Sequence, residues 1–335
     1  MNQGTNRVWL IFTLIGLLGL GIFPYSSSYA HYVLQEPQAS DWQYRAEGVK
    51  LYEEALRLFQ AGRIRPAIDK LFQALPLLRN AHDLRGTATV LNALGTAHSD
   101  LGEPEKGLPY LTDALKIRSD NYDFAAAAIT RLAIGSAYAD MGQPQQALDN
   151  YNQARRTFKD REDAKHEAKA LFMIARVYDD LSEKKQALVY CYDALRRIQD
   201  SDPSQIIQLY MLIGTLFADL GRFDDSIQNL EKARAVLDDP KTEKSQEGLA
   251  LVQGLTGLTY ARAGNMQKAL EFLTQARGTY HQLSDPGGEA SALNHIGSLQ
   301  ETLGQKEDAL QTYSLALQLS VMEITKEFLP ILGTI

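Results

Sequence analysis

The chain repeats itself about every forty residues. A small residue suited to a turn recurs at seven places, and subtraction of their numbers gives spacings of 40, 40, 40, 39, 43 and 40 residues. These places are Gly62, Gly102, Gly142, Ser182, Gly221, Gly264 and Gly304. An alanine follows each of them after twelve residues, as Ala74 follows Gly62. A period of this length predicts stacked copies of one supersecondary unit rather than a single globular core.

Each unit is predicted to contain two helices, here called helix A and helix B, joined by the small turn residue. In the second unit, Ala88, Leu91 and Leu94 are spaced three apart before the turn, and Leu108 and Leu111 after it, which places each set on one helix face. In six units, a residue that can cap a helix N-terminus lies twelve residues before a small residue, glycine or alanine, that recurs inside helix A. These residues are Asp83, Asp123, Asp163, Asp202, Ser245 and Asp285.

Small residues also recur inside both helices. Helix A carries Ala55, Gly95, Gly135, Ala175, Gly214, Gly257 and Gly297, and helix B carries Ala67, Gly107, Ala147, Ala187, Ser226, Ala269 and Ala309. Glycine within a helix costs about 1 kcal/mol relative to alanine, so its recurrence predicts a close helix contact that offsets this cost. Bulky residues of helix B are expected to fill the space beside it, namely Leu111, Tyr151, Leu230, Leu273 and Tyr313.

Stretches such as LGTAHSDLGEPEKGLPYLTDAL and IGSAYADMGQPQQALDNYNQA resemble the tetratricopeptide repeat in its longer form of about forty residues. The resemblance covers seven repeats over residues 41–320. It implies an all-α fold, a right-handed α-solenoid of stacked antiparallel helix pairs. Residues 70–79 and 285–313 are more narrowly similar to the repeat arrays that precede a caspase-like domain, called CHAT, in bacteria.

The first thirty residues have the pattern of a signal peptide. Arg7 precedes an uncharged run over residues 8–23, which is short for a membrane span of about twenty residues. Small residues Ser28 and Ala30 occupy the two positions that a signal peptidase inspects, so we predict cleavage before His31. The repeats would then be periplasmic or secreted, with no part inserted in a membrane. The alternative is an uncleaved N-terminal anchor.

Composition excludes some classes of partner and chemistry. The net charge of −7 lacks the basic excess of a nucleic-acid-binding protein. The only cysteine, Cys191, falls in the register of an apolar helix B position, so we expect it in the core. The six histidines follow no metal-ligand spacing, and the glycines belong to the repeat rather than to a phosphate-binding loop. The sequence therefore predicts no enzyme, no cofactor and no metal site.

The resemblance also implies where a partner binds, since family members usually hold a ligand along the concave surface made by successive helices A. The family positions lie three residues before, and one, four and five residues after, the small residue of helix A. Carried onto this chain, they give these candidate partner-binding residues: Asn92, Thr96, Asp100, Ser136, Asp140, Arg176, Asp180, Thr215, Asp219, Arg262, Asn294 and Ser298.

One recurrence among these candidates stands out, because Asp100, Asp140, Asp180 and Asp219 occupy the same position in four consecutive repeats. We call these four residues the acidic row. Each is expected near the C-terminus of its helix A, where a negative charge opposes the helix dipole by about 0.3 to 1 kcal/mol. Two interpretations stay open. The row attracts a basic segment of a partner, or its members are paired locally or simply tolerated at exposed helix ends.

The function that these features favour is a non-enzymatic protein–protein interaction scaffold, which binds a peptide or protein segment in its concave groove. The alternative is the sensor or recognition arm of a CHAT protease system whose catalytic domain lies outside these residues. Residues 321–335 are predicted to form a C-terminal helix or an incomplete eighth repeat, which would suit a chain cut from a longer protein.

Overall fold

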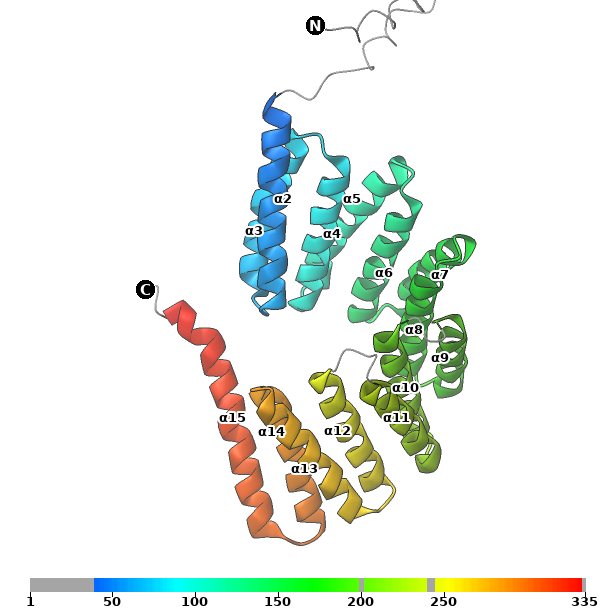
Figure 1. Cartoon of the computed structure of the whole chain (residues 1–335), viewed down its shortest axis with the longest axis vertical. Helices are drawn as coiled ribbons and strands as arrows, with labels where there is room; N and C mark the ends of the chain where they lie inside the picture. Colours follow the sequence, from blue (N-terminus) through cyan, green and yellow to red (C-terminus); the bar gives the residue numbers. More distant parts are fainter. Residues whose placement is uncertain (1–38, 199–201, 240–244, 333–335) are drawn as a thin grey trace, which may run out of the picture.

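A computed structural model describes residues 39–198, 202–239 and 245–332 of the chain, and these residues form helices joined by short connections, without strands. The helices are α2 (Ala39–Gln60), α3 (Ile64–Asn80), α4 (Leu84–Asp100), α5 (Pro104–Asp120), α6 (Phe124–Asp140), α7 (Pro144–Asp160), α8 (Ala164–Asp180), α9 (Lys184–Ile198), α10 (Pro203–Asp219), α11 (Phe223–Asp238), α12 (Gln246–Arg262), α13 (Met266–Gln282), α14 (Pro286–Thr302) and α15 (Lys306–Leu332) (Figure 1).

The even-numbered helices from α2 to α14 are the predicted helices A, and the odd-numbered helices from α3 to α15 are the predicted helices B. Most of them are 17 residues long, and three-residue turns join them, as at residues 101–103 and 121–123. Two such helices and two such turns account for the forty-residue spacing. The predicted fold class, an all-α right-handed solenoid of antiparallel helix pairs, is confirmed.

The ends of the helices agree with the sequence prediction. Each predicted cap accepts a hydrogen bond from the backbone N–H three residues later, as Asp83 does from Gly86 and Ser245 does from Gly248. The turn after helix A uses a left-handed residue, with φ of 73° at Gly102. Ser182 takes the same conformation with φ of 61°, which is less favourable for a residue with a side chain.

The predicted close contact between helices A and B is present. A Cβ atom built on Gly107 of α5 would lie 2.4 Å from the carbonyl oxygen of Gly95 on α4, so the two backbones touch. The predicted bulky residue fills the space beside each helix A glycine, as Leu111 does beside Gly95 and Tyr151 beside Gly135. This helix A position holds only glycine or alanine, because a larger side chain would separate the pair.

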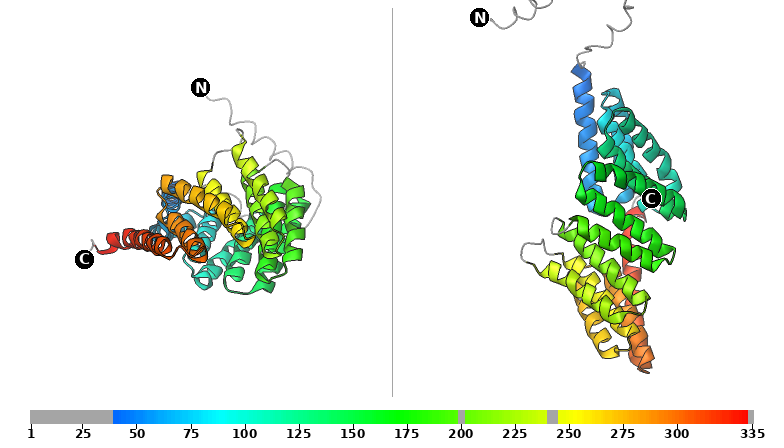
Figure 2. Two further views of the ribbon diagram at one scale, coloured as in Figure 1. Left: turned by 90° about the horizontal axis from the view of Figure 1, so that it is seen from below. Right: turned by 90° about the vertical axis from the view of Figure 1, so that its right-hand side faces the viewer.

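Successive helices A contact one another from α4 through α14, whereas successive helices B make no comparable contacts within the described residues. A layer whose members are closer together must lie on the inside of a bend. The chain accordingly curves from α2, through α7 and α9 on the outside of the bend, to α15 (Figure 1; Figure 2). The helices A therefore form the concave layer of the solenoid.

The two ends of the described solenoid differ in polarity. In α4, Val90 and Ala97 are buried against the preceding repeat. The residues at the same repeat positions in α2, forty residues earlier, are Lys50 and Arg57, and both are exposed. In α15, by contrast, Leu310 is 72% exposed and Leu317 is 66% exposed. The equivalent residues of repeat one, Ile68 and Leu75, are each only 7% exposed. The N-terminal helix thus carries charges at positions that are apolar in α4, although it also exposes Trp42, and α15, one continuous helix as far as Leu332, presents an apolar face.

The predicted signal peptide, residues 1–30, and its cleavage site lie outside the described residues. Among the helices that the structure does describe, none combines the length and apolar character needed to cross a membrane.

Candidate functional site

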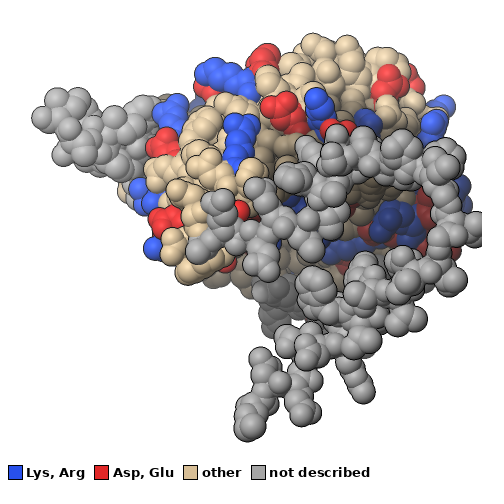
Figure 3. All heavy atoms as spheres, turned by 90° about the horizontal axis from the view of Figure 1, so that it is seen from above, with Lys and Arg blue, Asp and Glu red and all other residues tan. Residues whose placement is uncertain are grey.

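The candidate residues lie along the concave layer, as expected from their register in the helices A. The acidic row occupies the last residue of α4, α6, α8 and α10, and all four aspartates are exposed. Seen from above, the molecule is hollowed, and both basic and acidic side chains are visible inside the hollow (Figure 3). The concave layer is therefore polar and carries both signs of charge.

Four candidates, Ser136, Asp140, Arg176 and Asp180, surround one buried hydroxyl group. The Oγ atom of Ser136 lies 3.1 Å from the hydroxyl oxygen of Tyr151, a residue of α7 that is only 2% exposed. Burial raises the pKa of Tyr151, and the charges of Asp140 and Asp180 raise it further. The hydrogen bond with Ser136 and the charge of Arg176 lower it, but by less than burial raises it. The structure thus brings together candidates from repeats three and four around a phenol of helix B.

The sequence analysis assigned Tyr151 only to packing and missed its position at the site. Its ring passes directly beside Gly135, where a built Cβ atom would lie 2.5 Å from a ring carbon. The glycine lets the phenol reach the concave side of α6. Tyr313 passes Gly297 in the same way, and its hydroxyl lies 3.3 Å from Glu301. The signal in the sequence is a glycine–serine pair followed by tyrosine fifteen residues after the serine.

A second group forms around Asp219, where the acidic row is paired locally. Arg262 Nη1, from repeat six, lies 2.7 Å from Asp219 Oδ1, and Lys184 Nζ, from repeat four, lies 3.2 Å from Asp219 Oδ2. Burial by itself would raise the pKa of Asp219, but these two hydrogen bonds bring it below its ordinary value. Lys184 also pairs with Asp179 of α8. The local interpretation therefore holds for Asp219.

The other three aspartates of the acidic row have no ion-pair partner among the described residues. Asp100 and Asp140 are exposed at the surface, but nearby protein atoms replace part of the water around each carboxyl, and this partial burial raises its pKa. For Asp140, the charge of Arg176 opposes this increase, and the smaller effect of the Asp100 charge adds to it. Neither Asp100 nor Asp140 forms an ion pair within the described residues, so burial is the main cause of both raised pKa values.

The remaining candidates are engaged in other ways or stand apart. Thr96 and Thr215 donate their hydroxyl groups to carbonyl oxygens of their own helices, and Asn92 accepts a hydrogen bond from Arg118 at 3.3 Å. Asn294 and Ser298 are exposed on α14 and form no hydrogen bond or ion pair with the acidic row. The twelve candidates therefore form one cluster around Tyr151, one around Asp219, and scattered positions.

The double substitution Asp100→Asn and Asp140→Asn is expected to raise the free energy of unfolding at pH 7. Because the pKa values of Asp100 and Asp140 are raised in the folded state, their ionisation at pH 7 destabilises the fold. Below the ordinary carboxyl pKa of about 4, both groups are neutral in the folded and in the unfolded state. The stability gained by the double substitution should therefore disappear as the pH falls from above the raised pKa values to below about 4. Removal of each charge from a helix C-terminus adds about 0.3 to 1 kcal/mol. Denaturant titrations between pH 3 and pH 7 measure the effect.

The matched control is Asp120→Asn with Asp160→Asn, because these residues end α5 and α7 and share the helix-dipole effect without facing the concave layer. An equal gain with the same pH dependence in both double variants would contradict the assignment of the effect to the partly buried surroundings of Asp100 and Asp140.

The described residues offer few groups for metal binding or thiol chemistry. No cluster of three His, Cys, Asp or Glu side chains able to hold a metal ion occurs in the part of the chain that the structure describes. Cys191 is fully buried, and burial raises the pKa of its thiol to about 12, so it carries no thiolate at neutral pH. Its predicted place in the core is confirmed.

The geometry defines a class of protein, an α-solenoid of helix hairpins with a charged concave layer. Models of the tetratricopeptide repeat family match residues 87–119, 132–203, 205–280 and 290–320. The chain therefore belongs to the tetratricopeptide repeat family, whose fold is typically a non-catalytic scaffold for interactions between proteins. No curated protein matches the chain in sequence.

Solved structures show the same fold at low sequence identity. The apo form of RapI matches with a TM-score of 0.60 and 16% identity, over 84% of this chain and 99% of RapI. A Rap protein complexed with Competence and Sporulation Factor matches with a TM-score of 0.60 and 15% identity, over 88% and 78% of the two chains. A tetratricopeptide repeat protein from Parabacteroides merdae matches with a TM-score of 0.55 and 18% identity, over 85% and 98%.

Proposed function

We propose that this protein is a non-enzymatic scaffold that binds a basic peptide or protein segment along the concave layer of α4, α6 and α8. The observation that carries the proposal is the pair of neighbouring aspartates, Asp100 and Asp140, whose carboxyl groups have raised pKa values and form no ion pair within the described residues. A lysine or arginine of a partner placed between them would supply the counter-charge that both lack. A Rap protein of similar fold, whose structure contains a bound factor, supports binding as the function of the array.

The neighbouring polar groups suit the backbone and side chains of such a segment. Ser136 and the Tyr151 hydroxyl offer donors and acceptors beside Asp140, and Asp180 adds a third carboxylate that has no ion-pair partner in the described part of the chain. Arg176, exposed on α8, supplies a positive charge on the same side. A segment that carries a cation next to an acidic or amide group would match this arrangement better than a uniformly basic one.

The test uses fluorescein-labelled peptides of six lysines, six glutamates or six serines, with binding measured by fluorescence anisotropy at several salt concentrations. The lysine peptide is expected to bind best, and salt should weaken its binding. The variant with Asp100→Asn and Asp140→Asn should bind it on the order of ten-fold less tightly, because two exposed ion pairs contribute up to about 0.7 kcal/mol each.

The control variant with Asp120→Asn and Asp160→Asn removes the same charge from the convex side. An equal loss of affinity in both variants would mean that the peptide responds only to the net charge of the protein. Unchanged affinity in the first variant at every salt concentration would sink the proposal.

The alternative function is the recognition arm of a CHAT protease system. The exposed apolar face of α15, at Leu310 and Leu317, favours it, because each equivalent face elsewhere in the array is covered by the following helix A.

We also propose that the scaffold acts in the periplasm or is secreted. The intact mass of the protein from its native cells tests both ideas, since loss of residues 1–30 supports export and added C-terminal mass supports the recognition arm.

A further inference from the structure

Arg118 occupies a position that belongs to the apolar core in other repeats. It lies four residues after the recurring alanine of helix B. The equivalent residues Leu78, Phe158 and Ile198 are each 1% exposed, and Leu237 is 5% exposed. Arg118 itself is only partly buried, so its side chain keeps some contact with solvent. Partial removal of a charged group from water still costs free energy unless the group is paired, and its apolar counterparts have no such requirement.

The contacts of Arg118 within the described protein are all with neutral acceptors. Its Nη1 atom donates to Ala126 O at 3.0 Å, to Asn92 Oδ1 at 3.3 Å and to Thr130 Oγ1. Its other two guanidinium nitrogens, Nε and Nη2, form no hydrogen bond in this part of the chain, and no carboxylate lies within ion-pair distance. Burial lowers the pKa of Arg118, although the nearby charge of Asp123 opposes this change.

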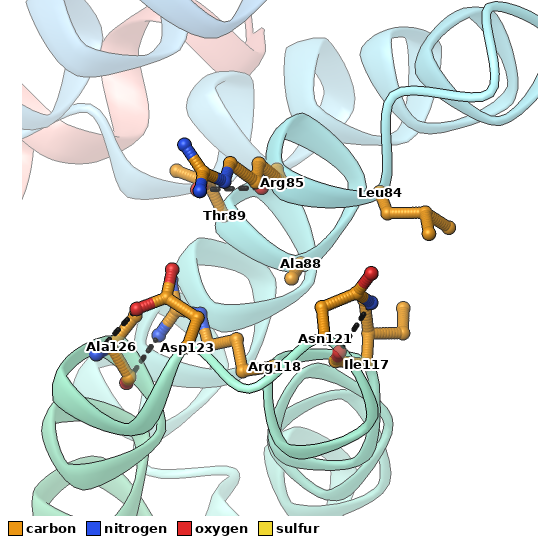
Figure 4. Close-up of a pocket in the computed structure, with 9 residues that line it drawn as sticks. All are labelled: Leu84, Arg85, Ala88, Thr89, Ile117, Arg118, Asn121, Asp123 and Ala126. Carbon is orange, nitrogen blue, oxygen red and sulfur yellow. Dashed lines mark hydrogen bonds between the residues drawn. The ribbon is translucent and has the colours of Figure 1, made fainter.

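A pocket of about 170 Å³ lies beside this side chain, between the start of α4, the end of α5 and the start of α6 (Figure 4). Leu84, Ala88 and Ile117 form its apolar side, where Asn121 also lies, and Arg118 and Asp123 lie across from them (Figure 4). This space is large enough for a small polar group, such as the carboxylate end of a side chain.

The charges that face the pocket leave it positive. Arg85, in the first turn of α4, also lines it and is exposed, and it forms no ion pair among the described residues. The one acidic group, Asp123, uses its Oδ1 atom to cap α6 by accepting a hydrogen bond from Ala126 N. Two arginines against one carboxylate leave one positive charge for an incoming anion.

We propose that this pocket is a binding site for one carboxylate group, with Arg118 and Arg85 as its cationic residues and Leu84, Ala88 and Ile117 as its apolar wall. The carboxylate comes either from an acidic side chain of a partner or from a free short-chain carboxylic acid. Arg118 and Arg85 pair with the carboxylate oxygens, and the aliphatic carbons of the ligand lie against the apolar wall. The site is separate from the acidic row and does not depend on the function proposed above.

Saturation-transfer-difference NMR tests this proposal at fixed ionic strength, with propionate as the free acid and capped Gly-Glu-Gly as the side-chain probe. Propionamide and capped Gly-Gln-Gly serve as neutral isosteres. At least one carboxylate probe should receive saturation while its isostere does not, and which of the two responds identifies the source of the carboxylate. No difference between either acid and its isostere would overturn the proposal.

Two variants assign the signal to the pocket. Arg118→Leu should weaken binding on the order of ten-fold, through loss of a charge-assisted contact. This variant is expected to fold, because Leu78 and Leu237 fill the same place in other repeats. Arg85→Gln, at an exposed position, should also weaken binding. Arg79→Gln, which removes an exposed arginine from the end of α3, should leave it unchanged. Full binding in both pocket variants would refute the assignment.

Discussion

Replacing Gly107 with leucine is expected to lower the free energy of unfolding by about 1 to 3 kcal/mol or more, although leucine is the better helix former. The Cβ atom alone would lie 2.4 Å from the carbonyl oxygen of Gly95 and 3.2 Å from its carbonyl carbon. These are backbone atoms, so no rotamer change can relieve the contact. The pair α4 and α5 would have to separate, with the loss of packing around Leu111.

The control for this prediction is Gly278→Leu in α13, because a Cβ atom at Gly278 meets no described atom within 4 Å apart from its chain neighbours and the nearby backbone of its own helix. That substitution should stabilise the protein by up to about 0.8 kcal/mol, since it removes a glycine from the interior of a helix. Guanidinium denaturation followed by circular dichroism measures both variants. Similar effects at the two positions would show that helix propensity, rather than contact between the backbones, governs the glycines of this repeat.

Truncation of Phe158 to alanine is expected to cost about 3 to 5 kcal/mol, the largest effect among the substitutions considered for this chain. Phe158 is 1% exposed at the end of α7. It packs in one cluster with residues of α6 and α8, and its ring stacks on His166 with centroids 5.1 Å apart. Its loss would leave a cavity between repeats three and four that the short turn between them has little freedom to close.

Because a solenoid is stabilised by contacts between neighbouring repeats, this loss is also expected to divide unfolding into two transitions. The cluster of Asp140, Arg176 and Asp180 spans the same interface, so peptide affinity should fall with it. Phe124→Ala, at a position 53% exposed, is the control and should change stability by less than about 1 kcal/mol. A single transition, shifted no more than that of the control, would contradict the assignment of Phe158 to the interface.

The sequence by itself determined the fold, because its signals are local and repeated. Caps such as Asp83 and turn residues such as Gly102 act within one or two helical turns of their own position, and the spacing of small residues such as Gly95 specifies which helix faces meet. Seven copies of one pattern strengthen each assignment. Export of the protein, which the uncharged stretch from residue 8 to residue 23 predicts, remains a prediction because that stretch lies outside the described residues.

The candidate site depended on information that the repeat pattern does not carry. The register placed the acidic row on one side of the helices A, but it could not distinguish Asp219, which is paired with Lys184 and Arg262, from Asp100 and Asp140, which are not. Pairing joins residues from three different repeats, so it follows from the angle at which the repeats stack.

The same physical reason explains Tyr151 and Arg118, whose roles only the tertiary structure decided. The hydroxyl of Tyr151 reaches the concave side because Gly135 leaves room for its ring, and Arg118 lies at a core position beside a pocket that three helices enclose. Hydrogen bonds, excluded water and pocket volume depend on distances of a few tenths of an ångström between repeats. The sequence determined the repeating unit, and the packing of one unit against the next decided which of its polar groups remain available for a partner.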